Sequence, residues 1–170
     1  MESHNKFLGH PIHPILIVFP IGLLGTGVLF DLITLLSGNG DWSRAAYFMI
    51  GAGVVFGLVA AFFGFRDWQA IPDQNRAKRV GLAHGIINAI VLVLFLLSWV
   101  LRRDDIASPD GAALLLSFVG AGLTTLSGWL GGELVYRLGV GIDENAHLNA
   151  SSSLSDAQNQ TQPHRDSGQD

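Results

Sequence analysis

The sequence contains no cysteine and only a few charged residues. Without cysteine the chain can form no disulfide, no thiolate metal site, no cysteine-ligated iron–sulfur cluster and no cysteine nucleophile. Charged side chains make up 14% of the residues, whereas about 25% is usual in a soluble domain. This is too few to keep the surface of a water-soluble protein wet. No basic patch suggests a nucleic acid partner.

In place of charge, the sequence has four long apolar runs, at 15–36, 45–65, 81–101 and 111–134. About 20 helical residues cross the hydrocarbon core of a bilayer, which is about 30 Å thick. A helix also satisfies all backbone hydrogen bonds of such a run within lipid. We therefore predict an all-α integral membrane protein, a four-helix bundle with both termini on the same side and the lipid bilayer as its surroundings.

The runs divide the chain into a short N-terminal segment (1–8), a membrane domain (9–142) and a polar tail (143–170). The tail is predicted to be disordered, because its Ser, Gln and Asp residues cannot bury enough apolar surface to fold. The first run is too long for a cleavable signal peptide and has no small-residue cleavage site after it. We expect it to stay in the mature protein.

The basic residues are divided unequally between the two sides of the predicted bundle. The side of the termini carries Lys6, Arg66, Arg76, Lys78, Arg79 and Arg137, and the other side carries Arg44, Arg102 and Arg103. Cytoplasmic loops of membrane proteins are enriched in Lys and Arg. The distribution predicts a multi-pass protein of the cell membrane with both termini in the cytoplasm.

Small residues recur at helical spacing on three of the predicted spans. Because lipid provides no hydrophobic drive for helix association, close packing needs such stripes. They predict a tight bundle, and a surplus stripe could instead mediate self-association. The stripes are Gly53, Gly57 and Ala61; Gly81 and Gly85; and Gly120, Thr124, Gly128 and Gly132.

The motif His10-Pro11-Ile12-His13-Pro14 precedes the first span. Pro14 suits the first turn of a helix, where its missing N–H costs nothing. This places His13 at or near the N-cap, beside the positive end of the helix dipole. The dipole favours neutral imidazole, the form that binds metals or accepts protons.

Other polar residues are predicted at the same end of the bundle. His84 lies about one turn into the third span, with Asn88 on the same face. Asp67 ends the second span, and Glu133, Tyr136 and Arg137 end the fourth. Glu133 and Arg137 have the i,i+4 spacing of an ion pair.

Asp31 is the exception, because it falls near the opposite end of the bundle. A carboxylate at this depth is costly unless it is paired. Arg44, Arg102 and Arg103 are the candidates to neutralise it.

Several motifs together resemble a family of bacterial and archaeal membrane proteins, domain of unknown function 2231. They are the His-Pro-Ile-His-Pro motif with Asp31, the Arg66-Asp67 pair, Ala83-His84-Gly85 with Asn88, and SGWLGGELVYRLGVG at 127–141. The resemblance implies a four-helix membrane protein over about 9–142, some relatives being joined to Rieske-type domains. Family members often have a histidine where this chain has Leu138. The family has no established activity, so the resemblance leaves the function open.

The first functional hypothesis is a haem b protein that takes part in electron transfer with a partner. Two neutral histidines on different helices at matched depth suit bis-imidazole ligation. His13 and His84 are the preferred pair, with His10 as the substitute ligand. Arg66, Arg79 and Arg137 are the candidates to meet the haem propionates.

Three alternatives remain open. One is a divalent-metal site with ligands from His10, His13, His84, Asp67 and Glu133, whose nitrogen and oxygen donors suit Zn, Fe or Mn. Another is a proton or ion path with Asp31 and the His/Glu cluster as its relay ends, although four helices with no inverted repeat and no broken helix make a poor transporter. The last is a non-catalytic scaffold or partner subunit, in which His13, Asp67, His84 and Glu133 form a hydrogen-bonded lock. No Ser/His/Asp or phosphate-loop motif indicates an enzyme.

Overall fold

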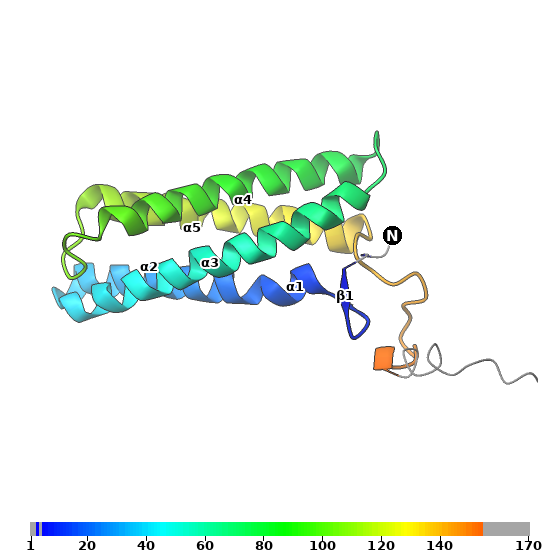
Figure 1. The fold of residues 1–170 in the computed structure, drawn as a ribbon, viewed down its shortest axis with the longest axis horizontal. Coiled ribbons are helices and arrows are strands. Elements are labelled where there is room, and N and C mark those ends of the chain that lie inside the picture. Colours follow the sequence, from blue (N-terminus) through cyan, green and yellow to red (C-terminus); the bar gives the residue numbers. More distant parts are fainter. Residues whose placement is uncertain (1–2, 4, 155–170) are drawn as a thin grey trace, which may run out of the picture.

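A computed structural model describes residues 3 and 5–154 of the chain (Figure 1). Long helices run side by side along the long axis of the molecule, and a short strand pair precedes them. In chain order the elements are β1 (Lys6–Phe7), β2 (His10–Pro11), α1 (Ile12–Leu16), α2 (Val18–Ser37), α3 (Gly40–Ala70), α4 (Arg76–Leu101), α5 (Gly111–Gly132) and the π-helix η1 (Glu133–Arg137).

The predicted all-α membrane architecture is confirmed. Four helical stretches are long and apolar enough to span a membrane, namely Ile12–Ser37, Gly40–Ala70, Arg76–Leu101 and Gly111–Arg137. They contain the predicted runs and extend all four of them by at least three residues. His10 Nε2 lies 3.3 Å from Ser153 Oγ, so the segment before the first span contacts the segment after the last one. The placement of both termini on the same side stays a prediction.

Local sequence signals start and stop the helices. The side chain of Asn39 accepts a hydrogen bond from Asp41 N and begins α3. Asn75 and Asp110 cap α4 and α5 in the same way. Gly38 ends α2 in the left-handed conformation, with φ of 69°, which glycine adopts without steric cost. The turn between α2 and α3 is therefore tight.

The first span is interrupted at Ile17, between α1 and α2. Pro20 explains the break, because proline has no N–H and its ring clashes with the carbonyl four residues earlier. That carbonyl belongs to Leu16, the last residue of α1. The short α1 carries His13.

The core lies in the middle of the bundle and is closely packed. Leu24, Ile50, Val54, Val91 and Phe95 form the buried cluster. The predicted small-residue stripes let the helices approach: Gly53 faces Leu24, Gly57 faces Leu92, Gly81 faces Trp68 and Gly120 faces Phe95, whereas Gly85 and Gly128 face open space.

The described residues before the first span form a short strand pair. β1 and β2 pair antiparallel, so that Phe7 lies opposite His10. The helix begins at Ile12 with Pro11 as its N-cap, which puts His13 inside the first turn. Of the tail, the residues from 155 on lie outside the described part of the chain, and its predicted disorder stays a prediction.

Candidate functional site

His13 is held against the second span. Its Nδ1 lies 2.8 Å from the carbonyl oxygen of Ala60 on α3. A carbonyl oxygen only accepts hydrogen bonds, so Nδ1 carries the proton and donates it. In the neutral ring, Nε2 then presents a lone pair. The ring is half-buried and packs on Gly64, one turn further along α3.

The His84 side chain on α4 contacts two polar residues, Asn88 on the same helix and Ser127 on α5. The side-chain Nδ2 of Asn88 donates to the backbone oxygen of His84 at 3.1 Å and lies 3.0 Å from its Nε2. The backbone contact identifies this atom as the amide nitrogen, so Nε2 must accept. Nδ1 therefore carries the proton and donates to the carbonyl of Ser127 at 3.0 Å.

This proton arrangement excludes a nucleophile–base pair in the present structure. Ser127 Oγ lies 3.1 Å from His84 Nδ1, but this nitrogen already holds its proton. A general base must offer a lone pair to the hydroxyl. Ser127 and His84 thus form a helix–helix contact and not an activated serine.

The two histidines face each other across the bundle. Their ring centres are 6.5 Å apart, and the ring planes are nearly perpendicular, at 87°. Both rings donate Nδ1–H to a backbone carbonyl of a neighbouring helix. Histidines that ligate metals almost always anchor their other nitrogen in this manner. The sequence prediction of matched depth for these residues agrees with this geometry.

The other predicted site residues of this end lie apart from the histidine pair. Asp67 accepts hydrogen bonds from Ser3 Oγ at 2.6 Å and Asn5 Nδ2 at 3.2 Å. Glu133 forms an ion pair with Arg76 at 2.6 Å. The predicted pair between Glu133 and Arg137 is therefore wrong.

The lock of four connected side chains is not formed either, because each acid has its own partner. Within residues 3 and 5–154, no three His, Asp or Glu side chains gather as metal ligands. His10 lies exposed on β2, away from His13 and His84. The remaining predicted residues of this end are exposed at the surface of the bundle, namely Arg66, Arg79, Tyr136 and Arg137.

At the opposite end, Asp31 meets Arg102, one of its three predicted partners. The guanidinium forms two hydrogen bonds to the carboxylate, of 2.6 and 2.7 Å. Ser98 and Ser117 complete the group, which we call the Asp31–Arg102 node: both hydroxyls accept from Arg102 at 3.2 Å. All of these side chains are fully buried. Sequence reasoning missed the two serines, although both stand on the inner faces of apolar helices.

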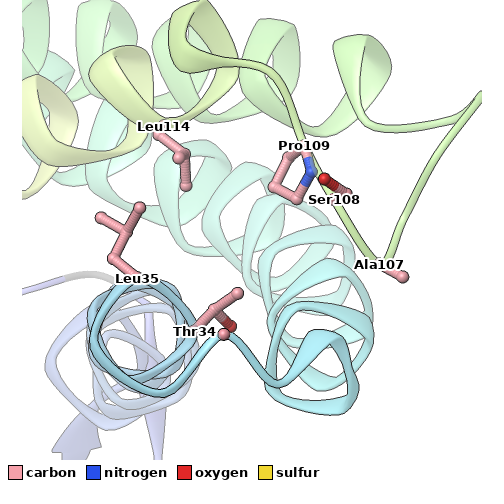
Figure 2. A pocket seen from close by; sticks show the side chains of 7 residues that line it. Thr34, Leu35, Ala107, Ser108, Pro109 and Leu114 are labelled. Carbon is pink, nitrogen blue, oxygen red and sulfur yellow. The ribbon is translucent and has the colours of Figure 1, made fainter.

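A shallow pocket of about 290 Å³ opens beside this end of the bundle. Thr34 and Leu35 line it from α2, and Pro109 and Leu114 line it from the loop before α5 and the first turn of that helix (Figure 2). Its lining carries no charged side chain, so it offers no specific chemistry.

Fold and site define the class: a four-span helical membrane protein with buried polar groups near both ends of its bundle. The family model described as "Predicted membrane protein (DUF2231)" matches residues 9–144. The chain belongs to this family of uncharacterised membrane proteins, as its motifs predicted. No curated protein and no solved structure matches the chain.

Proposed function

We propose that the protein is an electron-transfer subunit of the membrane that holds a haem b through His13 and His84. The observation that carries the proposal is the histidine pair, whose rings lie 6.5 Å apart with both Nδ1–H groups donated to backbone carbonyls. His13 and His84 would hold the haem through their Nε2 atoms, because the Nδ1–H of each ring is engaged with a backbone carbonyl.

The surroundings of the pair suit a cofactor of this kind. Gly64 and Gly131 stand beside the two rings and put no side chain there. Arg66, Arg79 and Arg137 are exposed at this end of the bundle, where propionates would emerge. A bound haem would supply one-electron chemistry, and the chain's part would be to position it through His13 and His84.

A divalent metal ion without a macrocycle fits this site less well. Such ions take four or more ligands in proteins. His10, Asp67 and Glu133, the predicted further ligands, lie apart from His13 and His84 and hold other partners. In a haem the porphyrin supplies four nitrogen ligands to the iron, so the protein would need to supply only the two histidines.

The second candidate function is a non-catalytic scaffold or partner subunit. It is favoured by the amide of Asn88, which occupies the Nε2 lone pair of His84 at 3.0 Å. In this case His13 and His84 would tie α1 to α3 and α4 to α5, and function would come from a partner protein. The Asn88 side chain has to move before His84 can ligate a metal, which separates the two candidates experimentally.

The test is the visible spectrum of the protein purified in detergent, with haemin added, before and after reduction with dithionite. We expect a Soret band that shifts on reduction and is lost in both His13→Ala and His84→Ala. His147→Ala, which changes an exposed histidine outside the spans, serves as the matched control. Asn88→Ala should bind haem at least as well as the native protein, because it frees Nε2.

A protein that stays colourless after haemin addition contradicts haem ligation. If His84→Ala, which removes the hydrogen bond to Ser127 on α5, then also lowers the unfolding temperature, the scaffold function is favoured. Interhelical hydrogen bonds within membranes contribute about 0.6 kcal/mol on average, so a small but measurable shift is expected in that case.

A further inference from the structure

The buried positions of the first span recur in the third. Helix α2 buries Pro20, Leu24, Gly27 and Asp31. Each has a buried counterpart on α4 or, for Asp31, at the C-cap of α4, at the separation of 71 residues that divides Asp31 from Arg102. In the same order the counterparts are Val91, Phe95, Ser98 and Arg102.

The buried positions of the second span recur in the fourth span in the same way. The offset is slightly shorter here and equals the separation between Ala46 and Ala113. All four buried residues of α5 have a buried counterpart on α3 at this offset. The pairs are Ala46 and Ala113, Ile50 and Ser117, Gly53 and Gly120, and Ala60 and Ser127.

The contacts within each hairpin are equivalent as well. His13 donates to the carbonyl of Ala60, and His84 donates to the carbonyl of Ser127. A Cβ built on Gly53 would meet the Leu24 side chain at 2.6 Å, and one built on Gly120 would meet Phe95 at 2.9 Å. The two offsets therefore belong to a single superposition of the first hairpin on the second. They are not two separate coincidences of helical spacing.

The hairpins α2–α3 and α4–α5 run in the same direction along the bundle (Figure 1), as in membrane proteins with parallel internal repeats. We propose that the membrane domain is a duplicated helical hairpin with a pseudo-two-fold axis along the bundle. In this arrangement the contact between Asp31 and Arg102 determines which hairpins associate. The first hairpin packs against the second hairpin, and neither packs against a second copy of itself.

The chemistry of the Asp31–Arg102 node carries this specificity. Equivalent positions meet across a two-fold axis, so a pair of identical hairpins would bring Asp31 to Asp31 or Arg102 to Arg102. Like charges without solvent are strongly unfavourable. Only the mixed pairing gives the two hydrogen bonds observed between these fully buried groups. A repulsive element against the wrong partner is a common means of specificity.

The first experiment reverses the charges in the full chain. Asp31→Arg alone and Arg102→Asp alone put like charges at the axis and should reduce the folding equilibrium constant by roughly 150- to 5,000-fold, as for a broken buried pair. Asp31→Arg combined with Arg102→Asp should recover most of the folded, monodisperse protein, measured by thermal unfolding in detergent. A double variant no better than either single variant overturns the proposal.

The second experiment tests pairing specificity apart from stability. In Asp31→Leu with Arg102→Met both positions are apolar, so like hairpins no longer repel, and chains should exchange hairpins and form dimers. Native mass spectrometry counts the chains. The control is Asp41→Leu with Arg44→Met, which removes an exposed pair of the same charges and should leave the oligomeric state unchanged.

If Asp31→Leu with Arg102→Met folds and keeps the native oligomeric state, the Asp31–Arg102 node adds stability without pairing specificity. This result overturns the proposal. Neither experiment depends on haem. A colourless protein would contradict the proposed function and leave the duplication in place.

Discussion

At the scale of single residues, Gly64 determines where the His13 ring can lie. A Cβ at this position would be 2.8 Å from Cε1 and 3.0 Å from Nδ1 of the ring. The hydrogen bond to Ala60 prevents the ring from simply turning away. Glycine is therefore required by close approach and not by backbone conformation.

We expect Gly64→Ala to displace His13 and to destabilise the protein by roughly 1–3 kcal/mol, the usual effect of overpacking. If the proposed haem is bound, its absorbance should fall as well. Thermal unfolding and the haem spectrum measure the two effects. Gly85→Ala is the matched control, because a Cβ there meets nothing within 4 Å. Equal stability of both variants would contradict the close contact at His13.

The sequence identified His13 because it directly precedes an apolar run next to two prolines, and His84 because it is the ionisable residue within another run. The sequence alone could not choose among three candidate partners for Asp31. The choice of Arg102 depends on the rotation of α4 about its own axis relative to α2. The Glu133–Arg137 pair failed because these residues span a π-helix, whose wider turn removes the i,i+4 alignment. The acceptor for His84 is a backbone carbonyl, which no side-chain pattern can indicate.

At the scale of elements, Lys78 closes the connection between α3 and α4. Its Nζ donates to the carbonyls of Trp68, Gln69 and Ile71 at 3.1, 3.3 and 2.9 Å. It also lies 4.4 Å from the Trp68 ring centre. The last carbonyls of α3 have no partner within the helix, and a cation at this end also complements the helix dipole.

Replacing Lys78 by Met should lower stability by about 1–2 kcal/mol, because charge-assisted hydrogen bonds are lost while the aliphatic stem is kept. Thermal unfolding in detergent gives the value. The neighbouring Arg79→Met removes an exposed positive charge and should have little effect. If the two variants unfold alike, the contribution of Lys78 is a general charge effect and not a cap of α3.

At the scale of the whole molecule, burial is low along every span. Only 17% to 28% of the most apolar window of each helix is buried inside the protein, so most side chains face outward. In water such a surface would cause aggregation, whereas in a bilayer it is solvated by lipid. The buried polar groups then connect helices near the two ends, and the apolar cluster fills the middle. The four spans could be predicted from the sequence because the hydrocarbon thickness of the bilayer sets the length of the apolar runs.

The structure also sharpens the prediction of orientation. Arg102 is buried with Asp31, which leaves Arg44 and Arg103 as the accessible basic residues predicted for the side opposite the termini. The positive-inside rule counts basic residues in the loops, so the removal of Arg102 strengthens the bias toward cytoplasmic termini.

Since the native chain has no cysteine, single cysteines can report this orientation directly. Ser108→Cys lies exposed in the loop between α4 and α5, and Asn145→Cys lies exposed after η1. With cytoplasmic termini, a membrane-impermeant maleimide should label the first variant in intact cells and the second only after lysis. The reverse pattern would mean that the histidine pair faces the outer side, and an electron-transfer partner would then have to be sought there.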